Sequence, residues 1–352
     1  MAVFAIPFVL KAVGAVCLAT GLINAKSGYD KRCKSEKMVK KACKRDERNL
    51  AEFNAVKDVA VSAMDELGKL EMEIISSFEV FSKIMEIIQA TPKFKSIFGN
   101  RIVLPELTLE TIKDAAKGAK VLWAGIGGAA AGTFAAFAAS GAITATTAAL
   151  GTTATGVSIS TLHGVAATKA TLALLGGGAV AKGGGGIYLG GLLLNFTTIG
   201  LGILIGGCIY NSTADKYVEQ ADAVYSAMLD NERKLSKLCS YLNVLNYHAV
   251  RYTKVLNQLY AKYKELLPEA VSIVEEGGEQ INFTSLSSSD QKVIEGLAIL
   301  TDLLYSCCKV SFVLPTEDEE EPNTVNVQGI NEAVEKAKKV FSDYFRENLD
   351  VD

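Results

Sequence analysis

A glycine-rich stretch around Lys182 is the first place where this chain could carry chemistry. Residues 171–186 read TLALLGGGAVAKGGGG, and seven of these sixteen residues are glycine. A phosphate-binding P-loop needs glycine directly before its lysine and Ser or Thr directly after it, whereas Lys182 lies between Ala181 and Gly183. A looser dinucleotide-binding pattern matches at 176–181, but it requires a preceding strand, and no alternating strand pattern lies nearby. Nucleotide binding is therefore not predicted.

The other reactive side chains are few and scattered. The chain has two histidines, His163 and His248, and seven cysteines without a CxxC pair. Adjacent Cys307 and Cys308 suit neither a zinc site nor a disulfide framework, so we expect free thiols and synthesis in a reducing cytoplasm. No catalytic-triad, metalloprotease or paired-carboxylate motif stands out. These observations predict a protein that is not an enzyme, without metal, cofactor or evident small-molecule substrate.

Charge is distributed very unevenly along the chain. The net charge of −3 argues against a nucleic-acid binder. Residues 121–214 contain only two formal charges, Lys169 and Lys182, in 94 residues. A soluble domain of average composition, with roughly 25% charged residues, would carry more than twenty there. We therefore predict that 121–214 is a Gly/Ala-rich region that inserts into a membrane.

Two kinds of uncharged segment follow each other inside this region. Residues 187–210 have no charge, and twelve of these 24 residues are Leu, Ile or Phe, which favours insertion. Residues 124–165 are instead rich in Ala, Gly and Thr, with a small residue at every fourth position. Such spacing lets helices approach closely, so this segment could insert with partner helices or form an Ala-rich core hairpin under the tail helices. The predicted helix-packing positions are Gly128, Gly132, Ala136, Gly186, Gly190, Gly202 and Gly206.

Aromatic and basic side chains mark the edges of the uncharged region. Trp123 begins it and Tyr210 closes it, as aromatic residues do at membrane interfaces. Lys169 and Lys182 would reach lipid headgroups or water with their long side chains. These four residues are the predicted interfacial contacts.

Heptad patterns predict a long helix on each side of the uncharged region. Apolar residues recur at 4,3 spacing through segment 26–92 from residue 57 onward, with Lys57 and Glu71 as the exceptions. The same spacing runs through 215–267, where Pro268 is expected to stop the helix. We expect an all-α fold in which long antiparallel coiled-coil helices flank a central hydrophobic membrane hairpin.

The chain before the first heptad run combines an apolar and a basic segment. Residues 1–25 predict a membrane or interfacial helix, with a buried packing helix as the alternative. Ten Lys and Arg against four Asp and Glu follow between residues 26 and 48. This block favours contact with anionic lipid, or it is an ordinary solvated helix face. The predicted lipid contacts are Lys31, Arg32, Lys34, Lys37, Lys40, Lys41 and Lys44.

Two further segments are expected to connect and pack. Residues 93–120 form a connector, with a fresh helix start near Thr108. Residues 268–352 are expected to form helices near 288–310 and 330–345 that pack on the long pair, separated by the acidic loop PTEDEEEPN.

The layout of long helices around a hydrophobic, Gly/Ala-rich hairpin resembles the cytolysin A class of α-helical pore-forming toxins and the apolipoprotein L family. The likeness covers residues 53–266 and is one of arrangement. The stretch STLHGVAATKATLALLGGGAVAKGGGG, 160–186, also looks like a glycine-rich signature of uncharacterised bacterial membrane proteins. The toxin resemblance implies that 124–210 inserts and that neighbouring subunits line a pore. The missing secretion signal and the free cysteines depart from a secreted toxin and favour an intracellular effector.

These features lead to two functional hypotheses. The first is a homo-oligomerising, membrane-associated α-helical protein that permeabilises or perturbs an anionic lipid bilayer. The alternative is a structural membrane scaffold that assembles through glycine-faced helices and projects a coiled-coil rod. A pore should depend on the small residues of 124–165, whereas a scaffold should tolerate their replacement by plain apolar spans.

Overall fold

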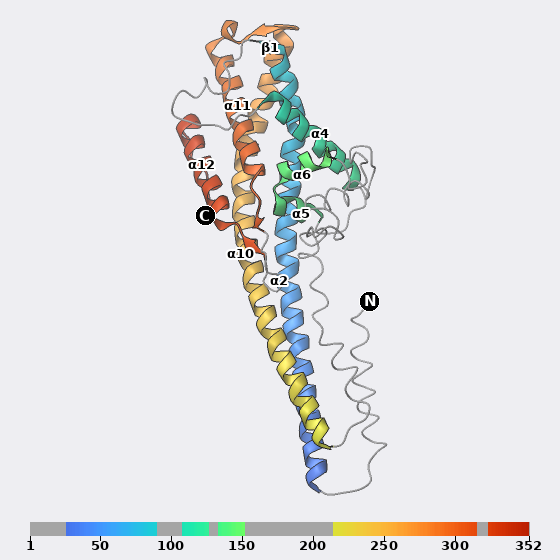
Figure 1. Ribbon diagram of the computed structural model, residues 1–352. Helices are drawn as coiled ribbons and strands as arrows, with labels where there is room; N and C mark the ends of the chain where they lie inside the picture. Colours follow the sequence, from blue (N-terminus) through green and yellow to red (C-terminus); the bar gives the residue numbers. More distant parts are fainter. Residues whose placement is uncertain (1–25, 90–107, 127–132, 152–213, 315–322, 352) are drawn as a thin grey trace. The chain divides into compact units, whose positions relative to one another are not determined.

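A computed structural model describes residues 26–89, 108–126, 133–151, 214–314 and 323–351 (Figure 1). The described chain is all-α, as predicted, and its strands are pairs of two-residue segments. Its helices are α2 (Lys26–Ile87), α4 (Leu109–Ile126), α5 (Thr133–Ser140), α6 (Ala142–Ala149), α10 (Ala214–Gly277), α11 (Ser288–Cys308) and α12 (Val327–Phe345). Strand β1 (Ile88–Gln89) pairs in parallel with β2 (Ile281–Asn282), and β3 (Val313–Leu314) pairs antiparallel with β4 (Thr324–Val325).

The chain divides into two compact units. Unit 1 comprises residues 1–58 and 195–242, so its described part is the first half of α2 with the first half of α10. Unit 2 comprises residues 59–194 and 243–352 and contains the remainder of both long helices together with α4, α5, α6, α11 and α12.

The heptad pattern correctly predicts which faces of the two long helices are buried. In α2 the seam positions Ala60, Met64, Leu67, Glu71, Ile74, Phe78 and Phe81 are all buried. In α10 the buried seam runs through Ala221, Val224, Met228, Asn231, Leu235, Leu238, Leu242, Leu245, Ala249, Tyr252, Leu256, Leu259 and Tyr263. Burial of this apolar stripe, at roughly 25 cal/mol per Å², is the main stabilising contribution of the pair.

The direction of the pair differs from the predicted one, because α2 and α10 ascend together in each unit (Figure 1). In unit 1, Ala42 packs against Val224 and Met228, and the next turn of α2 brings Asp46 to Asn231. In unit 2, the hydroxyl of Tyr263 donates to the carbonyl of Ser77, and Ile88 is in register with Ile281 in the parallel pair β1–β2. Later residues of α2 thus meet later residues of α10. No membrane hairpin is found in the described residues.

Helix α10 also continues past the predicted stop at Pro268 and ends at Gly277. Proline removes one backbone hydrogen bond and normally breaks a helix, at a cost of about 3 kcal/mol. Pro268 lies on the exposed side of α10, where water can satisfy the carbonyl that loses its partner. The helix ends instead where Gly278 adopts a φ of 88°, a conformation that glycine tolerates best.

The predicted helix start near Thr108 and the predicted tail helices are present. Thr108 caps α4, since its hydroxyl oxygen accepts from the backbone N–H of Thr111 at 3.2 Å. Helices α11 and α12 pack against each other in unit 2, and α12 buries the predicted face that includes Ile330, Val334 and Phe341. The acidic loop and the apolar segment 1–25 lie outside the described residues.

Candidate functional site: covered apolar helices and a basic helix face

Part of the uncharged region is folded into the core of unit 2. Helices α5 and α6 have eight residues each, and most of their side chains are buried. This arrangement matches the alternative of an Ala-rich segment covered by protein for 133–150. Among the helices in the described part of the chain, none has both the length and the apolar character required to cross a bilayer.

Helix α5 rests on α2 through a close backbone contact. The carboxylate of Asp65 accepts a hydrogen bond from the backbone N–H of Ala135 at 2.8 Å, which satisfies a donor in the first turn of α5. One turn further along α2, a Cβ placed on Gly68 would lie 2.1 Å from the carbonyl oxygen of Phe134. Only glycine therefore permits this separation. Trp123, predicted at a membrane interface, is half-buried and lies edge-on to Phe134 with 5.3 Å between ring centroids.

Helix α6 approaches α4 equally closely. A Cβ placed on Gly118 would lie 2.0 Å from the carbonyl oxygen of Thr146. The small-residue stripe predicted from 124 to 148 does not form one helix face. Helix α4 ends at Ile126, and the helical structure is interrupted again between α5 and α6. Of its positions, Ala136 is buried but Thr144 is exposed. Gly68 and Gly118 were not predicted as contact sites, although each is an isolated glycine in a helical run, which is a sign of close packing.

The corner between α5 and α6 is held by the segment that follows α11. Gly141 forms this corner with a φ of 83°, and a Cβ on it would lie 2.7 Å from the carbonyl oxygen of Lys309. The hydroxyl of Ser311 donates to the carbonyl of Ser140 at 2.9 Å. The side-chain amide of Asn326 in turn donates to the carbonyl of Ser311 at 2.9 Å. We call the contacts of Lys309 and Ser311 with Ser140 and Gly141, together with the support of Ser311 by Asn326, the corner clamp.

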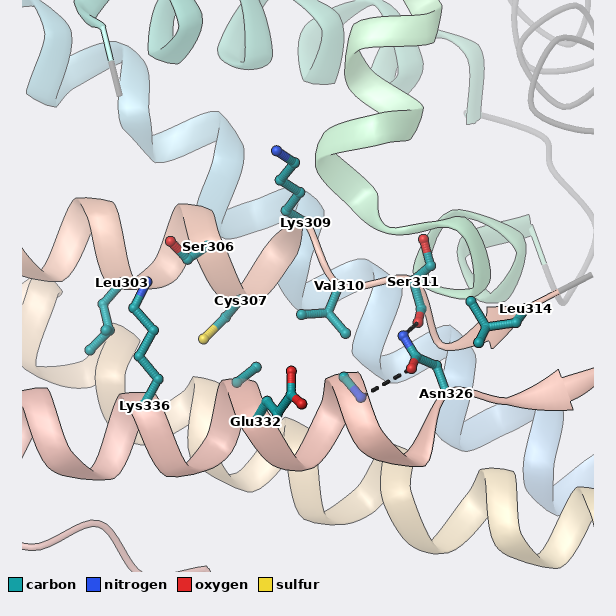
Figure 2. A pocket seen from close by; sticks show the side chains of 12 residues that line it. Leu303, Ser306, Cys307, Lys309, Val310, Ser311, Leu314, Asn326, Glu332 and Lys336 are labelled. Atoms are coloured by element: carbon teal, nitrogen blue, oxygen red, sulfur yellow. Dashed lines mark hydrogen bonds between the residues drawn. The ribbon is translucent and has the colours of Figure 1, made fainter. Parts of the chain in front are cut away.

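A pocket of about 460 Å³ lies between α11 and α12 beside the corner clamp (Figure 2). Glu332 and Lys336 line it from α12, and Cys307 lines it from α11. The carboxylate and the ammonium group give it both signs of charge. Because Ser311 lines this pocket, its side facing the pocket has no packed side chains from the described residues to hold the corner clamp in place.

Two carboxyl groups are buried in unit 2 without hydrogen-bond partners in the described residues. Glu71 on α2 is 0% exposed and Asp302 on α11 is 1% exposed, and none of their four oxygens has a partner. Burial raises the pKa of Glu71 well above its usual value. Burial also raises the pKa of Asp302 to about 6, although the nearby Lys336 acts in the opposite direction. Both groups are therefore held in an environment that favours the protonated form.

Unit 1 presents a basic face on α2. Its members share a 3,4 spacing, are exposed, and form no ion pair with a described residue: Lys34, Lys37, Lys41, Lys44 and Arg48. We call this set the basic face. Lys40, also predicted as a lipid contact, is exposed but pairs with Glu36 at 2.7 Å. Arg45 pairs with Glu232 at 2.8 Å.

The other predicted site residues are only partly described. Lys31 and Arg32 lie within α2, and the structure describes their backbone but not their side chains. Residues outside the described part of the chain are Gly128, Gly132, Lys169, Lys182, Gly186, Gly190, Gly202, Gly206 and Tyr210. The five cysteines in the described part, Cys33, Cys43, Cys239, Cys307 and Cys308, are free, as expected.

His248 is buried on α10, consistent with the expected packing role. It lies edge-on to Tyr247 with 5.1 Å between ring centroids, and burial lowers its pKa. The described residues contain no group of His, Cys, Asp and Glu side chains that could hold a metal ion. Comparison with protein-family models, with curated proteins and with solved structures finds no match to this chain.

Proposed function

We propose that this protein binds anionic lipid bilayers through the basic face and perturbs them with its uncharged region, acting as an oligomer. The observation that carries the proposal is the basic face itself: five exposed cations on one side of α2 without carboxylate partners in the described residues. Each Lys or Arg near an anionic membrane surface contributes about 1 kcal/mol of attraction. Five such groups on one helix face favour a surface of opposite charge.

Two features of the uncharged region support the membrane-perturbing part of the proposal. The region has two formal charges in 94 residues, so exposing it to lipid requires little desolvation of charge. Its described part is held on α2, α4 and the corner clamp by backbone contacts and a few hydrogen bonds. Release of α5 and α6 would leave apolar surface that a bilayer can cover.

The test is binding and dye release with vesicles of phosphatidylcholine alone or mixed with phosphatidylglycerol. The variant Lys37→Glu/Lys41→Glu/Lys44→Glu reverses the centre of the basic face. It is expected to bind the anionic vesicles at least 100-fold more weakly, since about 1 kcal/mol is lost per removed charge before repulsion is added. A matched control, Lys234→Glu/Lys292→Glu/Lys339→Glu, makes the same change in net charge at exposed lysines elsewhere.

The outcomes separate the two functional hypotheses. Leakage from anionic vesicles that the basic-face variant loses and the control keeps is the expected result. Binding without leakage would rule out bilayer perturbation and favour the membrane scaffold. Equal binding by both triple variants would show that the basic face is not the membrane contact.

A further inference from the structure

Glu71 is the least expected residue in the core of unit 2. It occupies a seam position of α2 between the buried Leu67 and Ile74, where a coiled-coil pattern calls for an apolar side chain. A buried carboxyl without a partner destabilises a fold, because ionisation inside an apolar core costs far more than ionisation in water. Glu71 therefore gives unit 2 a stability that depends on its protonation.

The groups that face Glu71 offer it no compensating charge. Tyr252 approaches from α10, and Cys307 and Cys308 approach from α11. The Tyr252 hydroxyl donates to the carbonyl of Cys307 at 3.0 Å and so is already engaged. No cation is among these groups, and Lys336 on α12 faces Asp302 and Cys307 instead.

The elements around Glu71 are also the elements that hold the apolar helices. One turn earlier on α2, Gly68 contacts the backbone of α5, and Asp65 caps that helix. At the other side, α11 carries Cys307 and Cys308 against Glu71 and continues directly into the corner clamp at Lys309. Ionised Glu71 requires solvation, and water that enters between α11 and α2 to supply it would therefore disturb both attachments of α5 and α6.

We propose that Glu71, assisted by Asp302, is a protonation-controlled latch on the apolar helices α5 and α6. With both carboxyls neutral, α11 stays packed on α2 and α10 and the corner clamp is closed. When they ionise, α11 loosens and the clamp opens towards the pocket beside Ser311. The latch regulates the exposure of the uncharged region and in that respect rests on the proposed function.

The direction of the pH dependence follows from the raised pKa values. A carboxyl with a folded-state pKa above its unfolded value stabilises the closed state fully below the unfolded pKa, near 4.5 for Glu71 and 3.8 for Asp302. This contribution is lost as the pH rises through the folded-state pKa. Acid thus closes the latch and neutral or alkaline pH opens it. Between pH 4 and pH 7, Asp302 alone is expected to raise the opening equilibrium roughly 50-fold.

The first test uses Cys308, which is 0% exposed and faces Glu71, as a natural reporter of opening. Its rate of reaction with a pyridyl disulfide is measured by peptide mass spectrometry between pH 4.5 and pH 8. Division by the rate of the urea-unfolded chain at the same pH removes the effect of thiol ionisation. In the wild-type chain the protection of Cys308 is expected to fall as the pH rises. Glu71→Gln, which cannot ionise, is expected to stay more protected than the wild-type chain at pH 8.

The control and the second readout make the test decisive. Glu66→Gln, at an exposed position of the same helix, should follow the wild-type profile. Trp123 is the only tryptophan and contacts Phe134 of α5, so its fluorescence should shift with the same pH dependence. Identical profiles for Glu71→Gln and the wild-type chain would overturn the latch. If Glu71→Gln loses its helical circular dichroism signal, the pH profiles of Asp302→Asn and of the wild-type chain replace it as the test. A flat wild-type profile overturns the proposal.

Vesicle leakage distinguishes the latch from the function that it controls. A pH-dependent opening without leakage at any pH would leave the latch intact and contradict bilayer perturbation. Leakage that increases with pH in the wild-type chain and is reduced by Glu71→Gln would support both. Leakage that is the same in both chains would overturn control of the membrane step by Glu71.

Discussion

Asn231 in unit 1 and Glu71 in unit 2 are both polar residues in the buried seam of a long helix, but their surroundings differ. The Asn231 side-chain amide donates to the carboxylate of Asp46 on the facing helix at 2.7 Å. Neither oxygen of Glu71 has a partner in the described residues. A polar pair across two helices can fix their register at a modest cost in stability. An isolated buried carboxyl gives no such benefit.

The comparison therefore separates two uses of polarity in one coiled-coil pattern. In unit 1 the polar position links α2 to α10 and is supported nearby by the ion pair of Arg45 with Glu232. In unit 2 the polar position weakens the core beside the apolar helices. In the sequence, Asn231 and Glu71 are both simply polar residues at heptad positions that are usually apolar.

The largest expected effect is the loss of close backbone packing in unit 2. Gly118→Ala places a methyl group where the carbonyl oxygen of Thr146 lies 2.0 Å away, and backbone cannot yield as a side chain can. We expect a decrease of about 3 kcal/mol in the free energy of unfolding of unit 2, in the range for overpacked sites. Urea unfolding followed by Trp123 fluorescence measures it. A wild-type midpoint in this variant would show that α4 and α6 are further apart than described.

A smaller effect of opposite sign is expected at Glu71. Replacing a buried ionisable group with an apolar side chain of similar volume often stabilises a fold, so Glu71→Met should raise the free energy of unfolding of unit 2 by about 1–2 kcal/mol at pH 7. The gain should shrink towards pH 4.5, where the carboxyl is neutral in the folded chain and only about half ionised in the unfolded chain. The measurement is the same urea unfolding at the two pH values. A destabilised variant at pH 7 would mean that Glu71 has a compensating partner.

The smallest expected effect lies in unit 1. Asn231→Ala removes the hydrogen bond to Asp46 and should reduce the stability of unit 1 by about 1 kcal/mol. Cys43, which is buried in unit 1 beside Ala42, reports this change through its alkylation rate. The Trp123 signal in unit 2 should not change. An unaltered Cys43 rate would remove the distinction between the two polar seam positions.

Sequence patterns are sufficient to predict the long helices and their buried faces. Heptad periodicity is a local, one-dimensional pattern, so the seam from Ala60 to Phe81 and the longer seam of α10 could be predicted residue by residue. It also predicted Thr108 as the start of α4, since capping depends on near neighbours in the chain. The exposed lysines of the basic face were predicted as well, although the pairing of Lys40 with Glu36 was missed.

The direction of the helix pair and the surroundings of its polar seam residues follow from long-range packing. An apolar seam packs in either orientation, so 4,3 spacing cannot distinguish parallel from antiparallel helices; contacts such as Ser77 with Tyr263 do. Alanine-rich segments have weak hydropathy that suits either lipid or protein surroundings, so only the contacts of Gly68 and Gly118 showed that α5 and α6 are covered by protein. Glu71 breaks the heptad in the sequence, but whether a carboxyl there is solvated, paired or isolated depends on residues far along the chain, Tyr252 and Cys308 among them. Long-range contacts of this kind produce no repeating pattern in the sequence, so they could not be predicted from it.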